Sequence, residues 1–206
     1  MQTEQNEKNT HGEDGRRSAR TRHSATLRHT KRLTAAALLV ALSFLLGLLA
    51  KSLQGAGPIR LTLEGLPIVL AGIILGPFYG AAVGLCADLA SCLMAGMAPL
   101  PLIALASALV GLVPGILSRL FLRGDRPLAT PPRFLPLLLM EGVAHLIGSV
   151  LIKSNALSRY YGLNLPLILF ARLGIYCGVA VLESYLLYLL LRSATVRREI
   201  ERQVLK

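Results

Sequence analysis

The sequence predicts an all-α integral membrane protein with six transmembrane helices and with both termini in the cytoplasm. Three observations support this fold class. First, 53% of the 206 residues are hydrophobic and the mean hydropathy is +0.58, more apolar surface than a soluble domain of this length could cover. Second, six apolar runs follow a polar N-terminal segment. Third, Lys and Arg gather in alternate connections between these runs.

The first segment, residues 1–32, contains almost no large apolar side chains and is rich in Arg, Glu, Asn, Ser, Thr and His. It cannot bury enough surface to fold alone, so we expect a disordered, basic cytoplasmic tail. Its polarity also argues against a secretory signal peptide. The membrane domain is then predicted at residues 33–192, and a charged cytoplasmic segment at residues 193–206.

Each apolar run is interpreted as one helix. The six runs are Leu33 to Ala50, Leu63 to Leu75, Phe78 to Met97, Leu100 to Leu122, Leu135 to Ile152 and Leu163 to Leu191. A spanning helix needs about 20 residues, and the second run covers only about 20 Å of a hydrocarbon core of about 30 Å. We therefore expect its neighbours to shield it, or the helix to extend through Glu64 or to be irregular at one end.

A tight helical hairpin is predicted where the second and third runs meet at Gly76-Pro77, because proline ends one helix and suits the first position of the next. Four glycines and one carboxylate follow each other at every fourth position: Gly72, Gly76, Gly80, Gly84 and Asp88. Small residues at this spacing let helices approach closely in a bilayer. The pattern indicates close packing that ends at a polar site.

The orientation follows from the basic residues. With six spans, seventeen of the 22 Lys and Arg residues fall on the side of the tail, the fourth loop and the C-terminus. Four fall on the other side, namely Lys51, Arg60, Lys153 and Arg159, and Arg172 lies within the last run. The positive-inside rule places both termini in the cytoplasm. The net charge of +11 is thereby explained by topology rather than by nucleic-acid binding.

Five ionisable residues lie inside the predicted spans: Asp88, Glu141, His145, Arg172 and Glu183. Such groups are costly in a bilayer and are usually paired or functional. Asp88 and Arg172 both reach about the midplane, so they are predicted to pair with each other or to contact opposite ends of one bound molecule. A structural role is favoured for the other three.

The outer connections, Lys51 to Thr62 and Lys153 to Asn164, are predicted to be loops that cap an outward-facing pocket. They carry bases and hydrogen-bonding or aromatic groups: Lys51, Gln54, Arg60, Lys153, Asn155, Arg159, Tyr160, Tyr161 and Asn164. Bases on this side could bind the carboxylates of a small anion, or they could be ordinary solvated loop charges.

No nucleotide-binding or hydrolase motif is present, and the three cysteines show no ligand spacing. The sequence therefore predicts neither an enzyme, nor a cofactor, nor a metal site. On the first run, Ala37 and Ala41 form a small surface on which another helix can dock.

The chain resembles the substrate-binding S components of energy-coupling factor (ECF) vitamin transporters, within them the folate-type family. The resemblance rests on Ala37-x-x-x-Ala41, on the run from Ile59 to Leu89, on the spacing of Ala106 to Leu117, and on IGSVLIK, YYG and FARL between Ile147 and Leu173. It implies a six-helix domain in the bacterial plasma membrane that binds a vitamin and assembles with a transmembrane T component and two cytoplasmic ATPases. It also implies that Ala37 and Ala41 face the T component.

For a folate, Asp88 can accept hydrogen bonds from the pterin edge, and Tyr160 or Tyr161 can stack on the ring. Arg60, Lys153 or Arg172 can bind the carboxylates, with Asn155 nearby. Three alternatives remain: an S component for another vitamin or small metabolite, an autonomous secondary transporter, and a small membrane scaffold.

Overall fold

A computed structural model describes residues 26–27, 29–50, 52, 63–96, 98–121, 132–200 and 202. Their regular structure is entirely helical, which confirms the all-α class. The helices are the first helix (His29–Ala50), α2 (Gly65–Leu75), α3 (Pro77–Met94), α4 (Pro101–Phe121), α5 (Phe134–Ala144), the π-helix η1 (His145–Ile152), α6 (Lys153–Tyr161), α7 (Leu165–Arg192) and α8 (Ala194–Ile200).

Five helices are long and apolar enough to cross a membrane, if α5, η1 and α6 are taken as the one continuous helix Phe134–Tyr161. Large apolar side chains cover their outer faces, and Phe78 is 82% exposed. Such a surface is suited to lipid rather than water. The protein is therefore a multi-pass membrane protein. The sixth apolar helix, α2, has only 11 residues and is buried at nearly every position.

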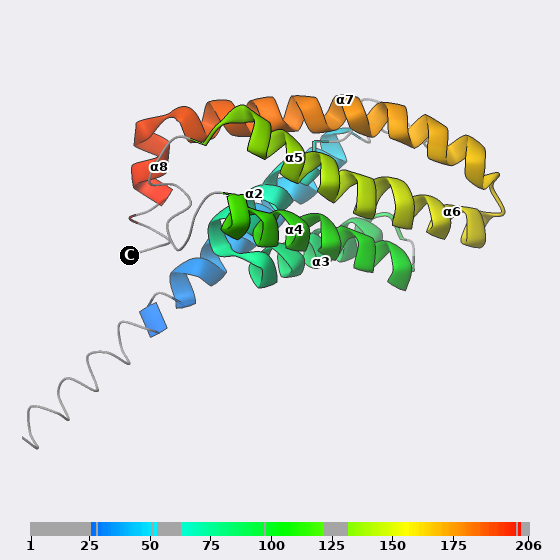
Figure 1. Cartoon of the computed structure of the whole chain (residues 1–206). Helices are drawn as coiled ribbons and strands as arrows, with labels where there is room; N and C mark the ends of the chain where they lie inside the picture. Colours follow the sequence, from blue (N-terminus) through cyan, green and yellow to red (C-terminus); the bar gives the residue numbers. More distant parts are fainter. Residues whose placement is uncertain are drawn as a thin grey trace, which may run out of the picture.

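The helices form two groups that pack side by side (Figure 1). In one group α2, α3 and α4 pack on each other; in the other, α7 lies along α5 and η1, and η1 joins the groups through α4. The first helix crosses behind both in that view and packs on the core through Ala36. Val69 and Val83 contribute to the same core.

Glycines bring α2, α3 and α4 into backbone contact, as the four-residue spacing predicts. A Cβ atom added to Gly72 or Gly80 would collide with the carbonyl oxygen of Gly111, and one added to Gly84 would collide with that of Ser107. Gly76 has φ +99° and ψ 172°, a conformation that is essentially open to glycine alone, and it separates α2 from α3. The predicted hairpin is thus present.

Two boundaries differ from the expectation. The segment from Lys153, predicted to be a loop, continues as helix to Tyr161 and ends at Gly162 with φ +65°. Lys153, Ser154 and Asn155 are polar, but they carry no helix breaker. The described part of the first helix includes the four residues before Leu33, from His29 to Arg32, and Thr34 donates its hydroxyl proton to the Thr30 carbonyl. The short helix α8 was not predicted.

Candidate functional site

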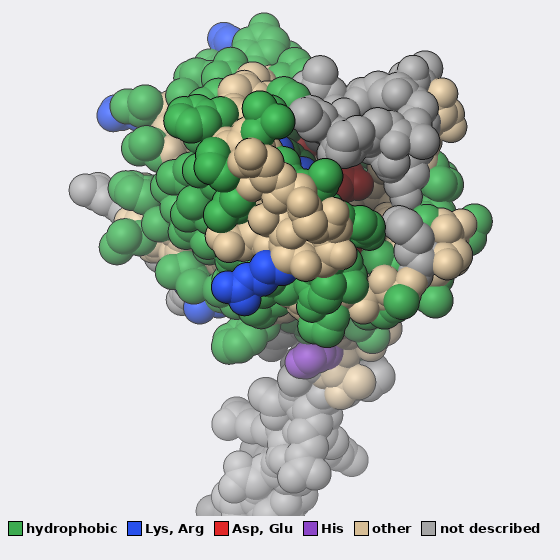
Figure 2. Space-filling model, turned by 90° about the vertical axis from the view of Figure 1, so that its right-hand side faces the viewer, with side chains coloured by type: hydrophobic (Ala, Val, Ile, Leu, Met, Phe, Trp, Pro, Cys, Tyr) green, Lys and Arg blue, Asp and Glu red, His purple; other side chains and the backbone are tan. Residues whose placement is uncertain are grey.

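A polar cavity of about 50 Å³ lies between the first helix, α2, α3, α4 and η1. Its charged and hydrogen-bonding walls include Ser43, Glu64, Asp88, Ser107, His145 and Lys153. Viewed from the end that carries α6, an acidic side chain is visible in a recess among hydrophobic ones (Figure 2). Concave sites with a few converging polar groups are the usual form of a small-molecule site.

Asp88 lies on α3 and faces this cavity with one oxygen unpaired. Its Oδ1 accepts a hydrogen bond of 3.0 Å from the Ser107 hydroxyl on α4. Its Oδ2 is buried and has no hydrogen-bond partner among the described residues. Gly84, one helical turn earlier, packs against the Ser107 backbone and so sets the distance between the two helices. The arrangement leaves one carboxylate oxygen ready to accept from a ligand.

Glu64 is a second acid on the cavity wall, and the sequence analysis did not propose it as a binding residue. It directly precedes α2, and its backbone carbonyl accepts a 2.7 Å hydrogen bond from Ser43 on the first helix. Its carboxylate lies beside Gly47, where an added Cβ atom would be 2.8 Å from Oε2. The only signal in the sequence was an acidic residue at the start of α2, a helix that is too short to span a membrane.

At the cavity wall, His145 contacts two buried carboxylates. Its Nε2 lies 2.7 Å from Glu183 Oε2 on α7 and 3.5 Å from Glu141 Oε2 on α5. Its Nδ1 lies 3.1 Å from the Ser149 hydroxyl. The Leu66 backbone N–H at the start of α2 donates to Glu183 Oε1 at 3.1 Å. The cluster thus joins α2, the helix Phe134–Tyr161 and α7.

Arg172 lies next to this cluster but pairs with neither acid. Its Nε donates to the Ser149 carbonyl at 3.0 Å, its Nη2 donates to the Tyr176 hydroxyl at 3.3 Å, and its guanidinium stacks over the Tyr176 ring. Within the described part of the chain, no ion pair joins Arg172 to Asp88. The direct ion pair is therefore absent. Contact with opposite ends of one ligand stays a prediction.

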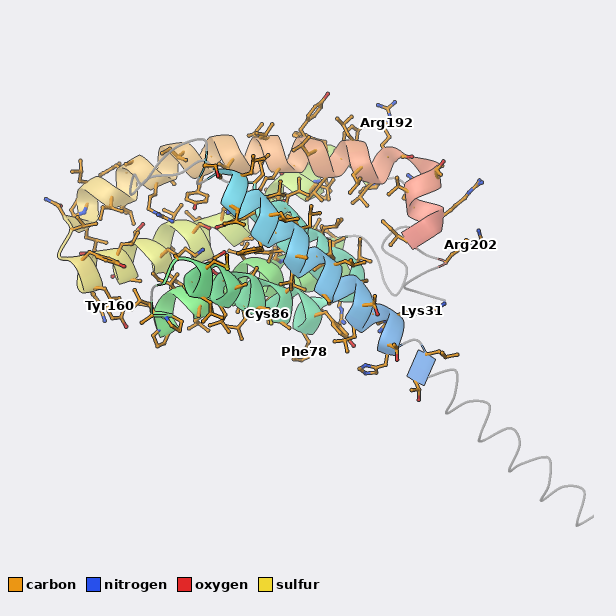
Figure 3. All side chains as sticks on the ribbon, turned by 180° about the vertical axis from the view of Figure 1, so that it is seen from behind. Lys31, Phe78, Cys86, Tyr160, Arg192 and Arg202 are labelled. Carbon is orange, nitrogen blue, oxygen red and sulfur yellow. The ribbon has the colours of Figure 1, made fainter. Side chains whose placement is uncertain are left out.

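The other predicted site residues are distributed more widely. Lys153 lies on the cavity wall, whereas Asn155 donates to the Leu151 carbonyl within its own helix at 3.4 Å. Tyr160 and Tyr161 are exposed at the end of α6 and do not line the cavity (Figure 3). Arg60 lies outside the described residues. On the first helix, Ala37 and Ala41 are both exposed.

Comparisons with known proteins agree with this architecture. The sequence model of the family described as "ECF transporter, substrate-specific component" matches residues 31–196. Among solved structures, the chain is similar to one described as a crystal structure of FolT bound with folic acid, with a TM-score of 0.64 and 19% sequence identity. The match covers 81% of this chain and 97% of that one, and it shows a shared fold. No curated protein matches.

Proposed function

The chain belongs to the family of ECF transporter substrate-specific components, and we propose that it binds a folate for import. The observation that carries the proposal is Asp88 Oδ2, a buried acceptor that has no hydrogen-bond partner among the described residues and belongs to a side chain that lines the cavity. A buried acceptor is costly to leave unpaired, so a ligand that donates hydrogen bonds there gains affinity. The folate-bound solved structure with the same fold supports this choice of ligand.

A folate offers matching groups at its two ends. The 2-aminopyrimidine edge of the pterin ring can donate to Asp88, and its glutamate carboxylates can bind bases nearer the α6 end, where Lys153 lies. Arg60, Arg172, Asn155, Tyr160 and Tyr161 remain proposed contributors. The cavity of about 50 Å³ is well below the 300–1,000 Å³ typical of ligand pockets. We therefore expect its walls to move apart when a whole vitamin binds.

A second candidate is a positively charged vitamin. Among the described residues that line the cavity, two are carboxylates, Asp88 and Glu64, and one is a lysine, Lys153. This balance of charge favours a cationic or strongly hydrogen-bond-donating ring over a purely anionic ligand. The class of transporter is the same in either case, and a ligand panel separates the two candidates.

We propose six crossings of a bacterial plasma membrane, with α2 as the short second crossing. Lys31, Arg192 and Arg202 lie at one end of the molecule and Tyr160 at the other (Figure 3). An even number of crossings brings both termini to the same side, and the gathering of bases there supports a cytoplasmic assignment. Energy would come from a T component and two ATPase subunits, which the family implies.

The experiment that tests the proposal is thermal unfolding of the purified, detergent-solubilised protein in the presence of folates and other water-soluble vitamins. Binding to the native state adds about 4 kcal/mol to the free energy of unfolding at a ligand concentration a thousandfold above Kd. We expect folates to raise the melting temperature and structurally unrelated vitamins to leave it unchanged.

A rise with a cationic vitamin alone would replace folate by the second candidate. If no vitamin raised the melting temperature, the binding proposal would be wrong and a membrane scaffold would be favoured. Uptake by cells that lack the ATPase partners would instead identify an autonomous secondary transporter.

A further inference from the structure

The cluster of Glu141, His145 and Glu183 places three metal-binding atoms within 4.8 Å of one another. We propose that this cluster binds a divalent transition-metal ion such as Zn²⁺. Each of these residues is at least 95% buried, and they come from two helices, α7 and the continuous helix Phe134–Tyr161. The proposal is independent of which vitamin the cavity binds.

The first argument is the unmet charge and hydrogen bonding of Glu141. The residue is fully buried, and neither of its carboxylate oxygens has a hydrogen-bond partner among the described residues. The 3.5 Å separation from His145 Nε2 is too long for a good hydrogen bond. A metal ion would satisfy the group directly.

The second argument is the balance of charge in the cluster. When both carboxylates are ionised and the imidazole is neutral, the cluster carries two negative charges, which a divalent ion neutralises. The guanidinium of Arg172 donates to the Ser149 carbonyl and to the Tyr176 hydroxyl instead of to either acid. A mixed set of imidazole and carboxylate ligands suits Zn²⁺ and its neighbours better than Mg²⁺ or Ca²⁺, which prefer oxygen.

The third argument is the orientation of the ligand atoms. Ser149 lies at Nδ1 of His145, so it can accept the Nδ1 proton and leave the lone pair of Nε2 directed at the two acids. The Leu66 N–H fixes one oxygen of Glu183. Ligand atoms around tetrahedral Zn²⁺ lie about 3.4 Å apart, so the 2.7 Å contact between His145 and Glu183 must widen by less than 1 Å.

The cluster borders the polar cavity on one side only. His145 lines the cavity, whereas Glu141 and Glu183 do not. Gly65 covers the cluster from α2, where an added Cβ atom would lie 2.8 Å from Glu183 Oε2 and 2.9 Å from His145 Cε1. Among the described residues, the side of His145 that borders the cavity is therefore the route by which a fourth ligand, such as water, can reach the cluster.

The test uses the full chain, purified without a polyhistidine tag, stripped with a chelator and titrated with ZnCl₂ alone. We expect one bound Zn²⁺ per chain and a higher melting temperature. Co²⁺, used as a spectroscopic probe, should give the visible absorption of a tetrahedral site. Glu141→Gln and His145→Gln should each weaken binding by at least about tenfold, and Ser149→Ala by about 10- to 100-fold.

The matched control is His29→Gln, which makes the same exchange of side chain at an exposed histidine on the first helix. Its Zn²⁺ affinity should equal that of the wild-type chain. If Glu141→Gln does not fold, Ser149→Ala serves in its place. The proposal is overturned if the wild-type chain binds no Zn²⁺ or Co²⁺, or if both cluster variants bind as tightly as the control. The proposal that the cavity binds a vitamin would not be affected by that result, because it is tested in a separate experiment.

Discussion

Asp88 lines the cavity; one of its carboxylate oxygens accepts a hydrogen bond from Ser107, and the other has no partner in the part of the chain that the structure describes. The two oxygens of this one side chain therefore have different roles, one in packing and one in ligand binding. The Ser107 contact holds the rotamer, and the free oxygen determines which ligand groups are accepted. Hydrogen bonds to a charged acceptor contribute about 1.5–3 kcal/mol, so this residue should dominate recognition.

Replacing Asp88 by Asn should therefore weaken vitamin binding by about 10- to 100-fold, because the amide keeps the shape but loses the charge. Titration of the ligand against the melting temperature, or calorimetry, measures this loss. Cys86→Ser is the control, since it alters an exposed side chain two positions away on the same helix. Equal affinity of Asp88→Asn and the wild-type chain would remove Asp88 from the site.

At this scale the sequence allowed only part of the site to be predicted. Asp88 and Lys153 could be found because a charge within or beside an apolar run is conspicuous, and both line the cavity. Glu64 and Ser43 were missed because their meeting depends on how the first helix crosses α2. The i, i+4 spacing of Glu141 and His145 is visible in the sequence. That Glu183 joins them in one cluster depends on how α7 packs, which the sequence does not show.

Among the elements, α3 and α4 depend on glycine for their contact. Gly80 and Gly111 approach so closely that neither can carry a side chain without moving a backbone. Dispersion and weak hydrogen bonds, rather than the hydrophobic effect, favour such contacts in lipid, and both depend steeply on distance. The same contact determines where Asp88 and Ser107 meet.

Gly80→Ala should consequently lower stability by about 1–3 kcal/mol, the usual cost of overpacking, and should weaken ligand binding as well. Gly174→Ala is a matched control, because an added Cβ atom there meets nothing within 4 Å. Melting temperatures of the two variants in the same detergent provide the comparison. Equal melting temperatures would contradict the packing described here.

The boundaries of the helices show which features of the structure a pattern of apolar residues can predict and which it cannot. The glycine spacing and Gly76-Pro77 predicted the α2–α3 hairpin, because both act locally on the backbone. The end of the helix Phe134–Tyr161 was placed too early, since polarity at Lys153 was taken for a loop although nothing stops the helix before Gly162. Hydropathy marks where a helix can meet lipid, not where its hydrogen bonding ends.

For the whole molecule, the first helix presents two different faces. Ala36 is buried in the core, whereas Ala37 and Ala41 are exposed between larger apolar side chains. The family implies a membrane partner, and a small-residue surface is suited to close helix contact. This surface is the proposed docking site for the T component.

Ala37→Leu with Ala41→Leu should abolish co-purification with the T component and the ATPases, because the added volume prevents close approach. Vitamin-dependent stabilisation of the isolated chain should persist, since neither residue lines the cavity. Leu42→Phe, which enlarges an exposed side chain outside the alanine pair, should leave co-purification intact. Retained assembly in the double variant would exclude this docking face.

The short helix α2 also has a consequence for how the protein is made. Eleven residues span only about 16 Å, so α2 is too short to leave the translocon as an independent span. It packs mainly on α3 and α4 and also contacts α7, and both α4 and α7 are synthesised later. The newly made α2–α3 hairpin must therefore be retained near the translocon until α4 emerges from the ribosome and completes its packing.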